Sequence, residues 1–156
     1  MIKYIPEDTA VCFAELPDEV ALGINLSCCP HQCIGCHSKY LQTDCGKELT
    51  RKVVDSLIST HSGITCVLFL GGDANKAALI DLSIYIRNSY NLLTGWYSGE
   101  SSLDLNYYGR YFDYIKIGPY IKDLGPLRSR TTNQRLYFIE RNKHPVDITD
   151  SFWHVR

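Results

Sequence analysis

One stretch of the sequence constrains the fold more than any other: the apolar run from Ile64 to Leu70, which ends in Gly71-Gly72. The run has the length of a strand, and its lack of polar alternation predicts a strand buried on both faces. Periodic apolar residues predict an amphipathic helix over 49–60 before it and a second over about 75–87 after it. A buried strand between two helices is typical of a mainly parallel sheet.

Further strands are predicted on both sides of this unit. Two extended segments, 10–16 and 20–26, are joined by a turn over 17–19, and shorter candidates lie at 92–97, 114–117 and 136–139. Alternating strands and helices imply right-handed crossovers. Because five or six strands are too few for a closed eight-stranded barrel, we expect an α/β fold with an open, partial (β/α) barrel and flanking helices. No repeat or linker divides residues 1–156, which we expect to form one domain.

Composition excludes some classes of function. The formal net charge is −1 and the basic residues are scattered, so we expect no positively charged surface that would attract nucleic acid. The N-terminus lacks the apolar core of a signal peptide, and no later stretch is apolar for long enough to cross a bilayer. We therefore expect a cytoplasmic protein without nucleic-acid or membrane partners.

The cysteines are unevenly distributed along the chain. Five of the seven lie between Cys28 and Cys45, whereas Cys12 and Cys66 sit apart in apolar stretches and are expected to be small core residues. In a reducing compartment such crowding indicates metal ligation rather than disulfides.

Three cysteines have a spacing suited to an iron–sulfur cluster. Cys29, Cys33 and Cys36 form the pattern C-x3-C-x2-C in a loop after the strand predicted at 20–26. Three thiolates can hold three corners of a [4Fe–4S] cubane, which leaves one iron open to a small molecule. Gly71-Gly72-Asp73 follows another strand, so both segments are expected at the carboxyl ends of the sheet, where ligands gather.

The cysteine spacing, together with Gly71-Gly72-Asp73 after a later strand, resembles the radical S-adenosylmethionine superfamily. The resemblance implies a partial barrel of that type, with the amino and carboxylate groups of S-adenosylmethionine on the open iron. Gly71 and Gly72 would let the backbone approach the methionyl ammonium, and Asp73 would add an acceptor. Gly35 stands where many members have an aromatic residue and is expected to offer backbone contacts. His37 is expected near the cofactor.

Two later strings narrow the resemblance. The segment 113–120 (DYIKIGPY) and the segment 132–135 (TNQR) are similar to segments of anaerobic ribonucleoside-triphosphate reductase-activating proteins. That resemblance implies that the chain installs a glycyl radical on the reductase. We expect an electron donor such as flavodoxin or ferredoxin, and a homodimer and a complex with the reductase both stay open. Thr94 belongs to the same match, and Lys116 substitutes for an acidic residue that many activases have at Ile117; both are expected to contact the cofactor.

Other interpretations stay open. The chain could activate a different glycyl radical enzyme, or it could be a non-catalytic zinc or iron–sulfur module. A zinc site would use Cys45, His31 or His37 beside the loop thiolates, although zinc more often uses C-x2-C pairs. Cys28 and Cys45 are expected not to be ligands of the cluster.

Overall fold

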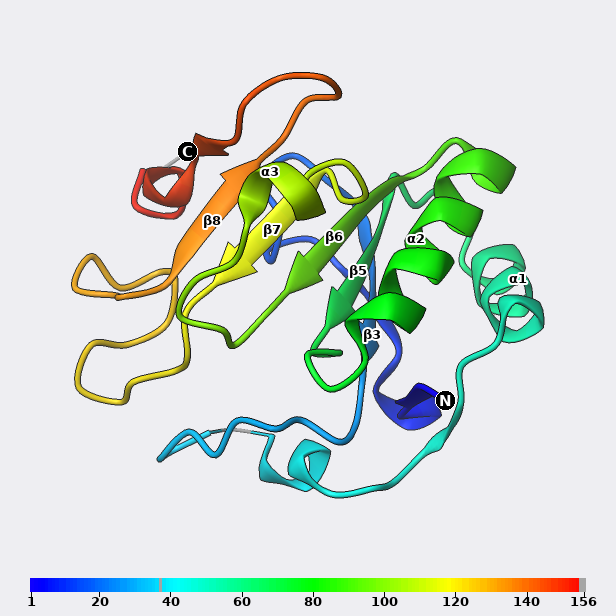
Figure 1. The fold of residues 1–156 in the computed structure, drawn as a ribbon, viewed down its shortest axis with the longest axis horizontal. Helices are drawn as coiled ribbons and strands as arrows, with labels where there is room; N and C mark the ends of the chain where they lie inside the picture. The colour runs from blue at the N-terminus through cyan, green and yellow to red at the C-terminus, as the bar shows by residue number, and fades with distance from the viewer. Residues whose placement is uncertain (37, 155–156) are drawn as a thin grey trace.

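The computed structural model describes residues 1–36 and 38–154 (Figure 1). Its strands are β1 Lys3–Tyr4, β2 Ala10–Cys12, β3 Ala21–Asn25, β4 Lys47–Glu48, β5 Cys66–Leu70, β6 Leu93–Tyr97, β7 Tyr114–Ile117, β8 Arg135–Phe138 and β9 Val146–Asp147. The α-helices are α1 Arg51–Thr60, α2 Lys76–Tyr90 and α3 Leu105–Tyr108, and short 3₁₀ turns cover Pro6–Asp8, Lys39–Gln42 and Thr149–Phe152.

The principal sheet has seven strands in the order β2-β3-β5-β6-β7-β8-β9. Its four central strands, β3, β5, β6 and β7, are parallel, while β2, β8 and β9 extend it with antiparallel pairings. The expected α/β architecture with a parallel centre is therefore present, and the sheet is open. That this open sheet is a partial barrel of the radical S-adenosylmethionine type stays a prediction.

Burial on both sheet faces follows from the apolar run in β5. Val67 and Phe69 pack with the helices on one face, whereas Cys66 and Leu68 belong to a second cluster on the other. Side chains alternate between the faces of a strand, so a run without polar residues supplies both clusters. Figure 1 shows α2 and α3 in front of the sheet with α1 beside α2, so the helices cover one face.

The two main helices begin at polar caps. The Thr50 side chain accepts a hydrogen bond from the Val53 N–H, and the Asn75 side chain accepts one from the Ala78 N–H. These bonds satisfy amide groups that have no partner within the helix. Helix α2 continues to Tyr90, beyond the expected end, and stops at Asn91, whose φ of 53° is left-handed.

The amino-terminal region differs most from expectation. The segment expected to extend over 10–16 is a strand only over Ala10–Cys12, where it pairs with the antiparallel neighbour β3. Cys12 consequently lies half-buried on an edge strand, not in the core, whereas Cys66 is fully buried as expected. The sequence pattern missed the two-stranded sheet of β1 and β4, whose strands are too short to show periodicity.

Candidate functional site

Four loops meet at one end of the sheet because the central strands are parallel. Asn25 pairs with Leu70, Leu70 with Tyr97, and Tyr97 with Lys116, so β3, β5, β6 and β7 end at one level. In Figure 1 the long loop after β3 crosses below these carboxyl ends. It contains the cysteines on which the sequence analysis focused.

The cysteine loop is held by backbone hydrogen bonds. The N–H groups of Cys28 and Cys29 donate to the carbonyls of Thr43 (3.0 Å) and Leu41 (2.7 Å), which tie the two sides of the loop together. The loop turns at Gly35, where φ is +77° and a side chain would be strained. The Cys36 N–H donates to the Cys33 carbonyl across this turn, at 3.2 Å.

The Cys29 thiol lies within electrostatic reach of the other two predicted ligands. Burial raises the pKa of the Cys29 thiol; a backbone hydrogen bond at His31 lowers it, and the charges of Asp73, Cys33 and Cys36 raise it further. Cys36 Sγ accepts a hydrogen bond from the Ser38 N–H at 3.4 Å. A metal that replaces the thiol proton would relieve the cost of a buried thiolate.

Cys28 and Cys45 have different surroundings. Cys28 Sγ lies 3.7 Å from Asp44 Oδ1, and Cys45 Sγ lies 3.4 Å from the Tyr40 carbonyl oxygen. Cys28 also has a left-handed φ of 60°. Both thiols thus have partners in the later part of the loop, at Tyr40 and Asp44.

Gly71 and Gly72 bring the backbone after β5 close to its neighbours. Both have a positive φ, of 105° and 101°. A Cβ on Gly72 would lie 3.0 Å from Leu26 Cδ1 and 3.1 Å from Leu79 Cδ2. The Gly71 carbonyl accepts a hydrogen bond from Trp96 Nε1 at 2.9 Å, so a fully buried indole fixes this turn.

Asp73 organises the centre of the site. Its side chain is 2% exposed, and its Oδ1 accepts a hydrogen bond from Ser98 Oγ at 2.6 Å. Its Oδ2 accepts from the Gly99 N–H at 2.8 Å and lies 2.9 Å from His31 Nε2. Asp73, the acceptor expected for the methionyl ammonium, is therefore a carboxylate that already joins the loops after β3, β5 and β6.

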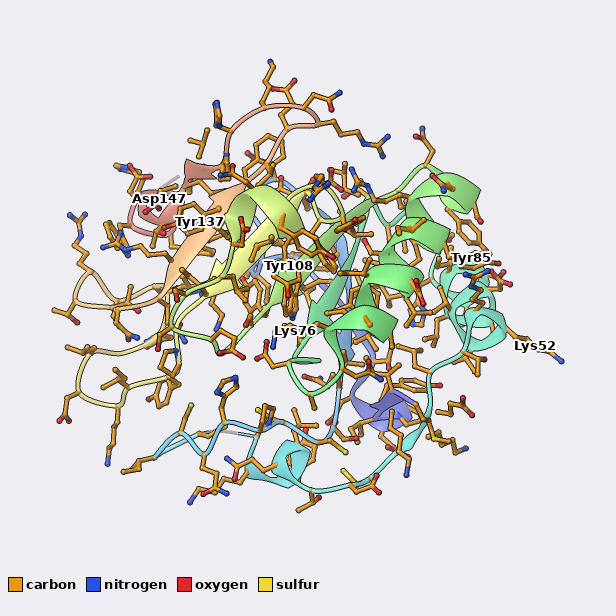
Figure 2. The ribbon with its side chains drawn as sticks, in the orientation of Figure 1. Lys52, Lys76, Tyr85, Tyr108, Tyr137 and Asp147 are labelled. Atoms are coloured by element: carbon orange, nitrogen blue, oxygen red, sulfur yellow. The ribbon has the colours of Figure 1, made fainter. Side chains whose placement is uncertain are left out.

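The sequence analysis did not identify the loop after β6 as part of the site. Ser98 and Gly99 bind Asp73, and Glu100 Oε1 lies 3.1 Å from Lys76 Nζ; Lys76 is labelled in Figure 2. Among the described residues, ligand atoms of His31, Asp73 and Glu100 all lie within 4.8 Å of one another. The rule that sites follow the carboxyl ends of parallel strands, applied to 92–97, would have pointed to Ser98 and Glu100.

Lys116, near the carboxyl end of β7, places a positive charge within electrostatic reach of the cysteine loop. It is 8% exposed, its Nζ donates to the Gly118 carbonyl at 3.0 Å, and the Nζ lies 5.6 Å from the centre of the Tyr97 ring. Burial lowers the pKa of Lys116 to about 8, although the negative charges of Asp73, Cys33 and Cys29 oppose this. Those three influences show that Lys116 lies within electrostatic reach of the site.

The remaining predicted contacts are distributed unevenly. Thr94 lies inside β6 near its amino end, fully buried, with its Oγ1 bonded to Ser83 Oγ (2.8 Å) and to the Tyr111 carbonyl (3.2 Å). The structure does not bring it to the site, because three residues of strand, about 10 Å, separate it from the carboxyl end at Tyr97. Gly35 faces Lys122 and Tyr120 of the loop after β7. His37 lies outside the described residues.

The two strings singled out late in the sequence contact each other. Asn133 Nδ2 donates to the Pro119 carbonyl at 3.0 Å, and Gln134 Nε2 donates to the Gly118 carbonyl at 3.4 Å. The segment 132–135 therefore supports the loop after β7.

Comparison with known families decides what kind of domain this is. Residues 20–130, more than half of the chain, match the family model described as a 4Fe-4S single cluster domain. The chain belongs to this family. The match covers the cysteine loop and every strand of the parallel centre. No match was found among curated proteins or among solved structures.

The residues present fit a 4Fe-4S cluster. Thiolates are the usual ligands of such clusters, and the loop after β3 offers three thiols, with those of Cys33 and Cys36 within electrostatic reach of Cys29. Within residues 1–36 and 38–154, no helix is both long enough and apolar enough to span a membrane.

Proposed function

We propose that the chain is a radical S-adenosylmethionine enzyme that activates the anaerobic ribonucleoside-triphosphate reductase. The observation that carries this proposal is the position of the cysteine loop. In a domain that binds a single 4Fe-4S cluster, the loop joins the Asp73 carboxylate at the carboxyl ends of parallel strands.

The cluster would be held by Cys29, Cys33 and Cys36, with Cys28 and Cys45 left to their partners in the loop. A cluster with three protein ligands can bind S-adenosylmethionine at its open iron and supply the electron that cleaves the C–S bond, which yields methionine and a 5′-deoxyadenosyl radical that removes hydrogen from a glycine Cα.

The chain's own residues would position the methionyl group. Lys116 is a buried cation whose Nζ donates to one acceptor among the described residues, the Gly118 carbonyl, and an ammonium has three donors. It can therefore donate to the methionyl carboxylate. The carbonyls of Gly71 and Gly72 each accept one hydrogen bond, from Trp96 Nε1 and from the Asn75 N–H, and each carbonyl oxygen has a second lone pair that could accept from the ammonium.

Asp73 would act as a positioning residue in this arrangement. Its carboxylate already accepts from Ser98 and Gly99 and hydrogen bonds with His31, so it fixes the loop after β6 against the cysteine loop. Its negative charge also favours an ammonium group nearby. The site would thus be assembled before the cofactor binds, which lowers the cost of ordering it.

The substrate would be a glycine on a loop of the reductase. The open sheet, taken as a partial barrel, would leave the carboxyl end accessible to a large partner that excludes water when it docks. Glycine suits this chemistry because its Cα carries no side chain to block approach. Flavodoxin or ferredoxin would supply the electron, and a homodimer is compatible with the proposal.

The test begins with anaerobic reconstitution of the cluster. The expected results are iron and sulfide in the ratio of one [4Fe–4S] cluster per chain, and formation of 5′-deoxyadenosine after reduction with S-adenosylmethionine. Cys33→Ala should abolish the product, whereas Cys28→Ala, a matched control in the same loop, should retain it. Addition of the reductase should produce a glycyl radical signal in EPR spectra.

Two results would overturn the proposal. Zinc without sulfide would identify a structural metal site. A full cluster without 5′-deoxyadenosine in the wild-type protein would identify an electron-transfer module.

A further inference from the structure

A second polar site lies at the opposite end of the sheet from the cysteine loop. A cavity of about 590 Å³ opens between the carboxyl-terminal half of α2, the segment from α3 to Tyr111, and the loop that joins β8 to β9. This loop follows Phe138, which pairs with the first residue of β7, so the cavity lies at the amino ends of the parallel strands. Pockets for small ligands usually have volumes of about 300–1,000 Å³.

The cavity concentrates positive charge in a chain that is slightly acidic overall. Arg87, Arg110, Arg141 and Lys143 line it together with His144, and the described lining includes no aspartate or glutamate. The whole chain has 16 lysines and arginines against 17 acidic residues. Such a cluster is therefore a local feature and not a reflection of composition.

Nearby acidic groups neutralise only part of this charge. Arg87 Nη2 lies 3.5 Å from Asp113 Oδ1, and Lys143 pairs with Glu140 at 2.9 Å. Arg110 lies over the rings of Tyr107 and Tyr111, which leaves its charge in place. In the described part of the chain no ion pair is recorded for Arg110 or Arg141.

Arg87 marks the inner wall of the cavity as incompletely satisfied. Its side chain is 8% exposed and its Nη1 donates to the Arg110 carbonyl at 2.8 Å, yet within the described residues its buried Nε has no hydrogen-bond partner. Burial lowers the pKa of Arg87, Asp113 opposes this, and the charge of Arg141 lowers it further. A buried donor without a partner and repulsion between neighbouring positive charges both cost free energy. An anion in the cavity would reduce the repulsion.

The loop between β8 and β9 presents its basic groups from a defined turn. The Lys143 N–H donates to the Glu140 carbonyl at 2.9 Å, and Asn142 has a left-handed φ of 62°, which asparagine tolerates well. Figure 2 shows nitrogen-tipped side chains around this loop, at the end of the molecule away from the cysteine loop. Leu105 and Ile139 contribute apolar side chains to the lining of the cavity.

We propose that this cavity binds a phosphate-bearing small molecule of nucleotide size. Guanidinium groups bind phosphate oxygens through paired hydrogen bonds, and the apolar wall suits the organic part of such a ligand. The site lies at the other end of the sheet from the proposed cofactor site and does not rest on the proposed function.

Calorimetric titration of the full-length protein, kept anaerobic, with ATP and with inorganic triphosphate tests the proposal. Arg141→Gln and Arg110→Gln should each weaken binding about tenfold or more, because each removes a charged hydrogen-bond donor. Both side chains are exposed, so the fold should be retained, which circular dichroism checks. Lys52→Gln, on the exposed surface of α1, removes the same charge elsewhere and should leave binding unchanged.

Each outcome bears on the proposal. Equal binding of triphosphate and ATP supports the site and assigns recognition to the phosphates; tighter binding of ATP supports it and adds contacts to the nucleoside. Absence of binding by both anions overturns it. If Lys52→Gln weakens ATP binding as much as the two arginine variants do, the proposal is overturned. It is also overturned if S-adenosylmethionine displaces ATP and Arg141→Gln binds ATP with wild-type affinity, because ATP would then occupy the cofactor site.

Discussion

Replacement of Lys116 by methionine is expected to stabilise the metal-free protein at neutral pH while it weakens binding of S-adenosylmethionine by the reconstituted protein. Methionine retains an unbranched side chain of similar length beneath Tyr97 but carries no charge. The substitution removes the free-energy cost of burying an ammonium group. Burial lowers the pKa of Lys116 from the ordinary 10.5 to about 8, which measures this cost.

The size and pH range of the effect follow from that difference. At about 1.36 kcal/mol per pH unit, the variant should be more stable at pH 7 by up to roughly 3 kcal/mol. Between pH 8 and 10.5 the unfolded chain retains a proton that the folded lysine has lost, so the unfolding free energy of the wild type rises with pH. The advantage of the variant should therefore be full below pH 8 and vanish above pH 10.5.

Urea denaturation of chelator-treated, reduced protein measures this effect. The wild type and Lys116→Met should be compared from pH 6.5 to 10.5, because titrating groups that do not interact with Lys116 cancel in the difference; Cys29 and Cys33, whose charges act on Lys116, do not cancel fully. A difference that does not change with pH would refute the assignment of a buried, charged lysine. After reconstitution, the variant should bind S-adenosylmethionine about tenfold more weakly or worse, since it lacks a charged hydrogen-bond donor; unaltered affinity would remove Lys116 from the proposed site.

Three further substitutions test which residues shape the proposed site. Asp73→Asn should cost about 1–3 kcal/mol in urea denaturation, because an amide cannot accept from Ser98 and Gly99 while it also satisfies its own donors; its yield of 5′-deoxyadenosine should fall, and wild-type values in both assays would contradict the positioning role. Gly72→Ala should cost about 1–3 kcal/mol, since its φ of 101° is strained for alanine and its Cβ would press on Leu26; thermal unfolding at the wild-type temperature would count against this turn. Thr94→Val should lower stability by about 1–3 kcal/mol through its lost buried hydrogen bonds and leave affinity for S-adenosylmethionine unchanged, so weaker binding would restore Thr94 to the site.

The sequence predicted the central elements because their signals are local. The apolar run that becomes β5 and the periodic helices around it depend on burial of contiguous residues, and the structure confirms α1, α2 and β5 to within a few residues. The short strands β1, β4 and β9 were missed, because each has two residues and exists only through its partner.

The chemistry of the cysteine loop was equally accessible from the sequence. Spacing along one loop limits which thiols can share a cluster, and the 4Fe-4S family match agrees with the cluster expected there. The identity of Cys29, Cys33 and Cys36 as its ligands stays a prediction that the proposed variants test.

Only the tertiary structure decided how residues distant in the chain meet. The sequence predicted Asp73 as an acceptor but not its protein partners: parallel strands bring His31 and Ser98 to its oxygens. Thr94 looked equivalent to these residues, yet its place near the amino end of β6 buries it away from them. The basic cavity arises in the same way, because α2 and the β8–β9 loop contribute charges that lie more than fifty residues apart and repel one another. Local patterns record what each segment buries, whereas strand order and register determine which polar groups must share a space.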